Sequence, residues 1–295
     1  MSERVIHHIE DRRFEFGENW SRFLEVLNDT RIEKAEESLK QRLKVTTLRD
    51  RTFLDIGSGS GLFSLAARRL GARVHSFDYD KRSVACTLEL KRQYCRDDKG
   101  WTIEEGSVLD EEYMGSLGQF DVVYSWGVLH HTGAMWRAFE HVAPLVKNGG
   151  ALFLAIYNDQ DGTSRRWRMI KRLYNTSPRV LRPFILVPVV LFYEGRYAIM
   201  DLLRGKNPLE PWIHIKDSRG MHKWYDWKDW IGGYPFEVAK PEEVFEFYRN
   251  RGFRLVTLKT RGGRGCNEFV FEEIGRGTSG CIPERFVNDS ASRRS

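Results

Sequence analysis

A run of glycines and a following aspartate, within residues 51–80, have the types and spacing to hold a nucleotide. Gly57, Gly59 and Gly61 alternate with single serines, so the backbone there can adopt positive φ and approach a ligand closely. Asp78 follows roughly twenty residues later, at the expected end of the next strand, where a carboxylate can accept two hydrogen bonds from a ribose diol. Together they predict a nucleotide-binding half-unit.

The elements that must position these residues can be predicted from the same stretch. The apolar run 53–56 is typical of a buried strand, and apolar residues recur at helical spacing over 62–70. A helix that begins near Gly61 directs its free N–H groups and its positive dipole end at the glycine loop. A second apolar strand, 74–77, ends next to Asp78. The predicted order is strand, glycine loop, helix, strand, acid.

The spacing of the glycines distinguishes between nucleotides. The loop reads G-x-G-x-G instead of the G-x-G-x-x-G of dinucleotide enzymes, and Asp55 stands two residues before its first glycine. A carboxylate there would repel a pyrophosphate but suits an ammonium group. In these residues the chain resembles the class I S-adenosylmethionine-dependent methyltransferases, whose signature is this "LDIGSGSG" followed by an acid after the second strand.

The resemblance implies S-adenosylmethionine as the cofactor. Asp55 and the glycines would face its methionine end, and Asp78 would bind the ribose. Where the family often places an acid for the adenine amine, this chain has Ser107, with Val108 next and Asp110 nearby as a substitute. The residues expected at the cofactor are Asp55, Gly57, Ser58, Gly59, Gly61, Asp78, Tyr79, Ser107, Val108, Ser125 and Trp126.

A second block, 120–158, carries the candidate catalytic residues. Its apolar strand ends at "SWGV", at the edge where open α/β sheets bind ligands, and two histidines follow. The pattern "FDVV…LHH…L…GG.L" again resembles this family, especially its small-molecule O-methyltransferases. An alcohol or phenol acceptor loses a proton as it attacks, and histidine is the usual base near neutral pH. We expect His131 to be that base, with His130 as the alternate, although one of them could serve only to fix the loop.

The same loop disfavours other methyl-transfer chemistry. Adenine and glutamine N-methyltransferases carry an Asn/Asp-Pro-Pro-Tyr-type motif where this chain reads "SWGV". Metal-dependent catechol-type enzymes need an acid at the position of Trp126, so no metal ion is expected. Transfer to carbon through a nucleophilic cysteine would need a cysteine in the pocket loops, where none is expected. An O-methyltransferase (EC 2.1.1) is therefore the expected activity.

The order of the predicted elements indicates the fold class. Strands and helices alternate through the core, 51–159, which predicts a Rossmann-like, doubly wound α/β sheet of seven strands that is mostly parallel. The segment 236–274 would complete it with a helix and an antiparallel edge hairpin around the glycine-rich "RGGRGC". Residues 1–50 are expected as a helical cap, which the family packs over the cofactor pocket, and 275–295 as a flexible tail.

Residues 160–235 are too many for a simple connection, so we expect a helical insertion that holds the acceptor site. It contains the basic helix "RRWRMIKRLYN", an apolar stretch expected as two helices broken at Pro188 or Gly195, and an aromatic-rich segment. Three interpretations stay open: a plain lid, a lid whose tryptophans stack on a sugar or aromatic ring, and contact of 165–200 with a membrane or lipid-linked acceptor. Candidate substrate-binding residues are Tyr157, Asn158, Trp224, Tyr225 and Glu237.

Composition limits these interpretations. The chain has 295 residues, of which 41% are hydrophobic and 30% charged, and its net charge of +6 favours acidic partners. Its four cysteines show no C-x-x-C pairing, so reduced thiols are expected instead of disulfides or zinc. The N-terminal sequence lacks the apolar core of a signal peptide. We expect a cytoplasmic protein, optionally membrane-associated, with nucleic acid an improbable partner.

Two further functions stay open. The basic charge and the aromatic segment are compatible with methylation of an RNA or protein side chain, although the expected elements include no auxiliary RNA-binding domain. A cofactor-binding module that no longer catalyses would keep Asp55, the glycines and Asp78 and lose only the base. The identity of the acceptor and the oligomeric state do not follow from the residues.

Overall fold

The structure, a computed structural model, describes residues 24, 27–207, 223–263 and 265–274. Within 223–232 the side chains of residues 223–226 and 229 also fall outside the description. The tail predicted for 275–295, and the part of the predicted cap before residue 24, therefore lie outside the described residues.

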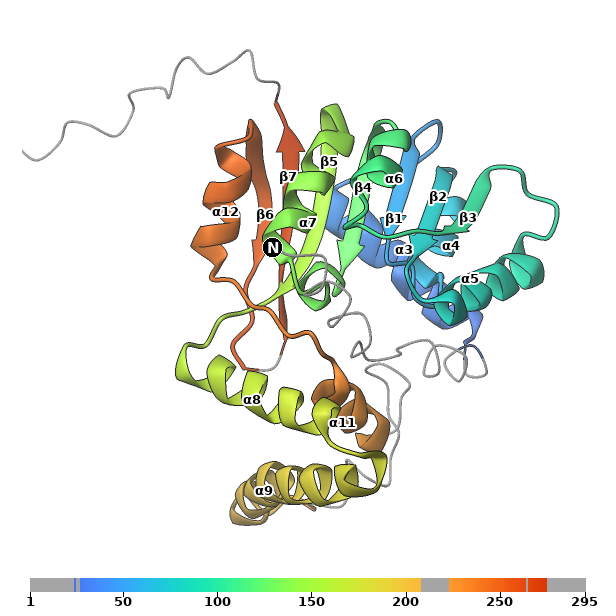
Figure 1. The fold of residues 1–295 in the computed structure, drawn as a ribbon. Helices are drawn as coiled ribbons and strands as arrows, with labels where there is room; N and C mark the ends of the chain where they lie inside the picture. The colour runs from blue at the N-terminus through green and yellow to red at the C-terminus, as the bar shows by residue number, and fades with distance from the viewer. Residues whose placement is uncertain (1–23, 25–26, 208–222, 264, 275–295) are drawn as a thin grey trace, which may run out of the picture.

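A seven-stranded sheet forms the centre of the fold (Figure 1). Its strands are β1 (Thr52–Ile56), β2 (Arg73–Asp78), β3 (Trp101–Glu105), β4 (Phe120–Trp126), β5 (Val146–Tyr157), β6 (Phe253–Lys259) and β7 (Cys266–Glu273). The helices are α3 (Asp29–Leu43), α4 (Leu62–Arg69), α5 (Lys81–Tyr94), α6 (Glu111–Ser116), α7 (Met135–Val142), α8 (Gly162–Thr176), α9 (Arg182–Leu203), α11 (Lys223–Gly232) and α12 (Pro241–Arg249). Short 3-10 turns are η1 (Leu129–His131), η2 (Ala143–Leu145) and η3 (Arg179–Leu181).

The strand order β3-β2-β1-β4-β5-β7-β6 confirms the predicted doubly wound sheet with an antiparallel edge. Strands β1 to β5 pair in parallel, and β7 runs antiparallel between β5 and β6. The chain reverses its direction of winding between β1 and β4, which are neighbours in the sheet. The crevice for a ligand is expected beyond the carboxyl ends of these two strands.

Helices cover both faces of the sheet. Successive side chains of a strand point to opposite faces, so apolar neighbours in one strand belong to two different cores. Leu54 belongs to a core with residues of α6, α7 and α12, whereas its fully buried neighbour Phe53 belongs to a core with α3, α4 and α5. Helix α3 packs beside α4 on the second face. The described part of the predicted cap is thus one of the helices that cover this face of the sheet.

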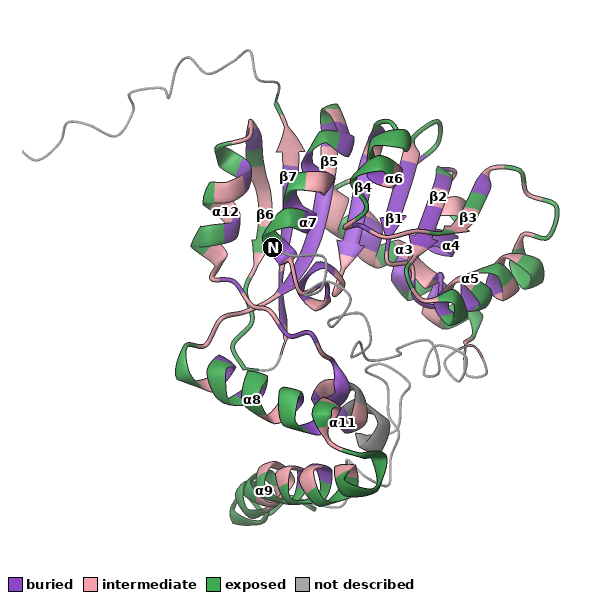
Figure 2. Cartoon of the chain, viewed as in Figure 1, coloured by how far each residue is buried: buried purple, intermediate pink, exposed green. Residues whose placement is uncertain are grey.

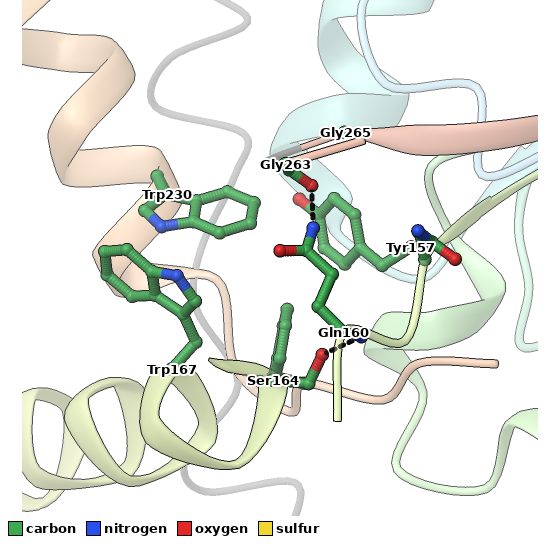
Figure 3. Close-up of a pocket in the computed structure, with 9 residues that line it drawn as sticks. Tyr157, Gln160, Ser164, Trp167, Trp230, Gly263 and Gly265 are labelled. Atoms are coloured by element: carbon green, nitrogen blue, oxygen red, sulfur yellow. Dashed lines mark hydrogen bonds between the residues drawn. The ribbon is translucent and has the colours of Figure 1, made fainter. Parts of the chain in front are cut away.

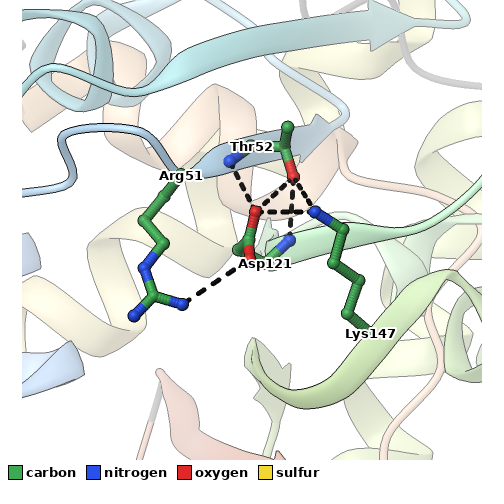
Figure 4. A network of polar contacts seen from close by, with 4 residues as sticks. All are labelled: Arg51, Thr52, Asp121 and Lys147. Carbon is green, nitrogen blue, oxygen red and sulfur yellow. Dashed lines mark hydrogen bonds and ion pairs between the residues drawn. The ribbon is translucent and has the colours of Figure 1, made fainter.

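At the end of the sheet opposite the crevice, Asp121 connects the starts of three strands (Figure 4). Its carboxylate accepts hydrogen bonds from the backbone N–H of Thr52 at 2.8 Å and from Lys147 Nζ at 2.8 Å, and Arg51 lies 3.5 Å away. Burial opposes its ionisation, but the hydrogen bonds from Lys147 and Thr52 hold the pKa of Asp121 well below its usual value. The starts of β1, β4 and β5 are therefore joined through one carboxylate.

The insertion forms a layer beyond the carboxyl ends of β4 and β5, with α8 and α11 next to the sheet and α9 farthest from it (Figure 1). The chain enters at the end of β5 and returns beside it, where Asn158 and Ala239 form a parallel bridge. An apolar cluster that joins α8, α9 and α11 stabilises the layer internally.

Helix α9 corrects one expectation. It is a single helix through Pro188 and Gly195, where a break was predicted. A proline inside a helix loses one backbone hydrogen bond and costs roughly 3 kcal/mol. Leu186 and Val190, on either side of Pro188, are both buried in the apolar cluster of the insertion. Their packing stabilises the helix on both sides of the proline and offsets that cost.

Candidate active site

The glycine loop leaves β1 in a conformation that needs its glycines. Gly57 has φ +74°, and a Cβ on it would lie 2.5 Å from the side chain of Val128, which follows β4. The N–H groups of Gly57 and Ser58 donate to the carbonyl of Phe77, at 2.9 and 3.1 Å, so the loop is anchored on β2. Gly61 is the N-cap of α4 and supplies no side chain to its first turn. The start of α4 thus keeps backbone donors for a ligand.

Asp78 stands at the carboxyl end of β2 and reaches back to this loop. One carboxylate oxygen accepts from the N–H of Gly59 and the other from the N–H of Asp80, both at 2.9 Å. Burial raises its pKa to about 6, against the lowering effect of these hydrogen bonds. Each oxygen has a second lone pair, so the carboxylate can still accept from ribose hydroxyls.

Asp55 lies deeper than the loop it precedes. It is 2% exposed, and its carboxylate accepts a hydrogen bond from Ser64 on α4. Ser64 in turn lies 2.7 Å from Ser76, whose hydroxyl accepts from Trp101 Nε1. Burial raises the pKa of Asp55 to about 7. The carboxylate therefore fastens α4 to the sheet, and its contact with an ammonium group stays a prediction.

His130 is fully buried in η1, just after β4. Its Nδ1 accepts the backbone N–H of Tyr157 at 3.4 Å, which leaves the ring hydrogen on Nε2, an atom that lacks a hydrogen-bond partner within the described part of the chain. Burial, followed by the nearby His131 and Lys171, holds its pKa well below the usual value. His130 is neutral and its lone pair is already used, so this geometry favours a positioning role.

His131 has the opposite arrangement. Its Nδ1 lies 2.7 Å from the carbonyl oxygen of Pro235, which can only accept, so Nδ1 carries the hydrogen and Nε2 carries the lone pair. Burial and the Lys171 ammonium lower its pKa to about 3, against the effect of the Pro235 hydrogen bond. His131 is therefore neutral at physiological pH and is able to accept a proton through Nε2.

Beside the histidines, a small cavity of about 10 Å³ lies between the sheet and the insertion (Figure 3). The residues that line it are Tyr157, Asn158, Gln160, Ser164, Trp167, Trp230, Phe236, Gly263 and Gly265. Tyr157 lines the pocket and also contacts the two histidines. Its ring centroid is 3.9 Å from that of His130 and 5.4 Å from that of His131. Gln160 donates to the Gly263 carbonyl and directs its own oxygen toward the tryptophans.

Lys171 is a residue of this region that the sequence interpretation missed. It is fully buried, its Nζ donates to the carbonyl of Trp230, and it lies 4.2 Å from the Trp230 ring centroid and 4.8 Å from that of Phe236. The available signal was its spacing of four residues from Trp167, which places both side chains on one face of α8.

Other predicted site residues serve local structure in the described chain. The carboxylate of Glu237 accepts from the N–H of Met135 at 3.0 Å and so caps α7. The amide of Asn158 binds Asn267 and the carbonyl of Arg261, which joins β5 to the β6–β7 hairpin. Trp224 and Tyr225 lie in α11, with their side chains outside the described residues.

The predicted adenine side shows a similar pattern. Val108 is buried in the core, and Ser107 accepts the N–H of Leu109 at 3.2 Å. Asp110 is the N-cap of α6 and accepts from Tyr113. At the end of β4, Ser125 is buried and donates to the carbonyl of Ile56, which couples β4 to the start of the glycine loop. Two predicted residues remain: Tyr79, which is 44% exposed and directly follows β2, and the partly buried Trp126, which ends β4.

A family model described as a methyltransferase domain matches residues 54–152, which begin in β1 and end in β5. The chain carries a class I S-adenosylmethionine-dependent methyltransferase domain. Its cofactor is S-adenosylmethionine, and the glycine loop, the uncapped start of α4 and the Asp78 carboxylate fit that cofactor.

Relatives of the methyltransferase domain are distant. The ubiquinone biosynthesis O-methyltransferase of Methylocella silvestris is 28% identical over 158 residues, 48% of this chain and 60% of that protein. The enzyme of the same name from Pelagibacter ubique is 26% identical over 139 residues, 46% of this chain and 55% of that protein. This chain thus spans somewhat more than half the length of these relatives.

Among solved structures, magnesium protoporphyrin IX methyltransferase from Synechocystis PCC 6803, with bound SAH, has the same fold at a TM-score of 0.50. It is 13% identical, and the match covers 82% of this chain and 83% of that chain. An O-methyltransferase family protein from Burkholderia thailandensis also gives 0.50, at 13% identity, over 87% and 63% of the two chains. The shared feature is the α/β methyltransferase fold.

Proposed function

We propose that this methyltransferase transfers a methyl group to a hydroxyl oxygen of a small, ring-shaped acceptor. The observation that carries the proposal is the position of His131. Its Nδ1 is fixed by the Pro235 carbonyl, its Nε2 keeps the lone pair, and it adjoins Tyr157 at the wall of the pocket. A neutral imidazole held in one tautomer beside an acceptor pocket is suited to take a proton from a hydroxyl.

The composition of the pocket supports a ring as the acceptor. The indole rings of Trp167 and Trp230 meet edge to face, with centroids 5.3 Å apart, and with the ring of Phe236 they give the cavity an apolar lining. The amides of Asn158 and Gln160 supply polar groups at its rim. Apolar walls with a few placed hydrogen-bonding groups suit a sugar or a phenol.

S-adenosylmethionine, when bound, supplies the methyl group from its sulfonium centre, and the remainder of the cofactor is then a neutral thioether. The work of this chain is then to align the acceptor, exclude water and take one proton. His131, with a pKa of about 3, does not remove the proton before attack. The acceptor hydroxyl becomes strongly acidic as its oxygen gains the methyl group, so Nε2 of His131 accepts the proton late in the reaction. The Lys171 charge then favours its release to solvent.

The names of the relatives support oxygen as the acceptor atom, since two of those compared are O-methyltransferases of ubiquinone biosynthesis. One observation favours a second candidate, methylation of a protein side chain. The ribosomal protein L11 methyltransferase of Helicobacter hepaticus is 27% identical over 118 residues, 40% of this chain and 35% of that protein.

Product analysis separates the two candidates. The purified chain is incubated with methyl-labelled S-adenosylmethionine and, separately, with sugars, phenols and a ribosomal protein fraction. We expect label in a small-molecule methyl ether. Label in polypeptide, or in an amine or carbon product, would overturn the proposal.

The pocket is tested by Trp230→Ala. We expect the KM for the acceptor to rise about tenfold, because one stacking wall is lost, while the affinity for S-adenosylmethionine is kept. Trp136→Ala is the matched control, since Trp136 is exposed on α7 and does not line the pocket. Equal acceptor KM in both variants would place the acceptor elsewhere.

A further inference from the structure

Helix α9 is apolar on two opposite sides but packs with only one of them in the described chain. Leu186 and Val190 are 3% and 4% exposed, buried in the cluster with α8 and α11. Phe184 and Leu191 are 75% and 67% exposed. Figure 2 shows α9 as the helix farthest from the sheet, with much of its surface exposed. Burying such a surface would be favourable, so it calls for a partner.

Many of the exposed apolar residues of α9 lie on one side of the helix. We call outer face the set Phe184, Val187, Leu191, Phe192, Leu202 and Leu203. Several of them recur at helical spacing, so they line the side opposite the buried residues. By length and composition, the stretch 179–203 is long and apolar enough to cross a membrane, with a mean hydropathy of 1.4. The composition of the helix is thus compatible with contact between its outer face and lipid.

The charge of the surrounding segment indicates the kind of partner. Residues 162–206 contain ten Lys and Arg and two acidic residues, a net charge of +8, which exceeds the +6 of the whole chain. Exposed cations on α8, on η3 and on and after α9 are Arg165, Arg166, Arg168, Arg172, Arg179, Arg196, Arg204 and Lys206. Of the two acids, Glu194 is turned inward and accepts from Trp227 Nε1 at 2.9 Å. An apolar helix face with exposed cations on the helix and at both of its ends matches an anionic lipid surface.

Two other occupants are less compatible with these observations. To cross a bilayer, α9 would have to leave its cluster, in which Tyr193 stacks on Trp167 at 5.0 Å and Glu194 holds Trp227. A second copy seated on the outer face would bring two segments of +8 together, which repel each other. Lipid head groups with negative charge are attracted instead.

We propose that the outer face of α9 docks this protein on an anionic membrane surface. The apolar side chains enter the boundary between head groups and acyl chains, and the flanking Arg and Lys contact the head groups. Because Trp167 lines the pocket and stacks on α9, the membrane lies one helix layer from the acceptor site. The docking does not depend on the proposed acceptor.

Vesicle flotation of the full chain tests the proposal. We expect binding to phosphatidylglycerol-rich vesicles that weakens with salt, and much weaker binding to pure phosphatidylcholine. Leu191→Glu with Phe192→Glu should lower the affinity by about tenfold or more, because two charges enter the apolar contact. The matched control is Leu88→Glu with Tyr94→Glu, which alters exposed apolar residues on α5 and should leave binding unchanged.

A second pair of variants guards against misfolding. Arg179→Glu with Lys206→Glu reverses charges on exposed residues at the two ends of α9 and keeps the helix apolar faces intact. It should weaken binding to anionic vesicles about as strongly, while calorimetry gives unchanged S-adenosylmethionine affinity for every variant. Equal vesicle binding by all variants would overturn the proposal. So would self-association in lipid-free sedimentation that the Leu191 and Phe192 changes abolish.

Discussion

The two halves of the site are built by different means. The cofactor half is shaped by backbone: Gly57 at positive φ, N–H groups that donate to Phe77, and Asp78 fixed on the N–H of Gly59. The half proposed to bind the acceptor, called the acceptor half here, is shaped by side chains, such as the rings of Tyr157 and Trp230 that meet from β5 and α11 at 5.3 Å. Backbone geometry tolerates little change, whereas packed rings can be exchanged. The comparison implies that one half keeps the cofactor while the other sets the acceptor.

Removal of the expected base should reduce turnover more than any other change proposed for the two halves. His131→Ala should lower kcat by roughly a hundredfold to ten-thousandfold, the usual contribution of a positioned base, with unchanged S-adenosylmethionine affinity. His130→Ala should act through the Tyr157 N–H that it accepts, and so disturb acceptor KM along with kcat. Steady-state kinetics and calorimetry measure both. Full turnover by His131→Ala would move the base elsewhere.

On the cofactor side, Asp78→Ala removes the ribose acceptor and frees the N–H of Gly59. The affinity for S-adenosylmethionine should fall by about ten- to a hundredfold, the value of hydrogen bonds to a charged group. At saturating cofactor, acceptor KM should be kept, because the pocket lies in the other half. Calorimetry is the measurement, and an unchanged dissociation constant would remove the ribose assignment.

The two halves should also respond to pH separately. Burial raises the pKa of Asp78 to about 6, so the charged form that accepts ribose hydroxyls is present above that pH and lost below it. S-adenosylmethionine affinity should fall about tenfold for each pH unit below that pKa. Asp78→Asn should remove this dependence below pH 6, where Asp55, with a pKa of about 7, is already mostly protonated. His131 has a pKa of about 3, so turnover at saturating cofactor should stay constant over the same window.

The smallest expected effect concerns Lys171. Lys171→Met removes the buried ammonium that disfavours protonation of both histidines, so the pKa of His131 should shift slightly upward. Burial, the larger cause of the lowered pKa, is unchanged. The pKa of His131 should therefore remain well below its usual value. Titration of the histidine ring signals by NMR measures the shift. A downward shift would contradict the placement of the ammonium.

The sheet could be predicted because its evidence is local. Most strands contain a short apolar run, and the glycine loop and Asp78 fall within one half-unit of sequence. The engagement of Asp55 could not be predicted in the same way. Its partner Ser64 stands nine residues later on α4, and its burial depends on how that helix packs on the sheet.

Two features of the insertion could not be predicted, because they depend on contacts between segments that are distant in the sequence. Lys171 belongs to a run of basic residues that suggests a solvated face, and it is buried only because rings from α11 and the following loop cover it. The break predicted at Pro188 was wrong because packing on both sides of the proline outweighs its local cost. Contacts between distant segments decided both outcomes.

The position of β7 has a consequence for synthesis of the chain. This strand, Cys266–Glu273, is the last of the sheet in sequence, yet it lies between β5 and β6. Until it emerges from the ribosome, β5 presents an open edge and β6 has no strand to pair with in the finished order. A chain interrupted before residue 266 would expose that edge to other strands, so truncation there should lead to aggregation instead of a smaller folded core.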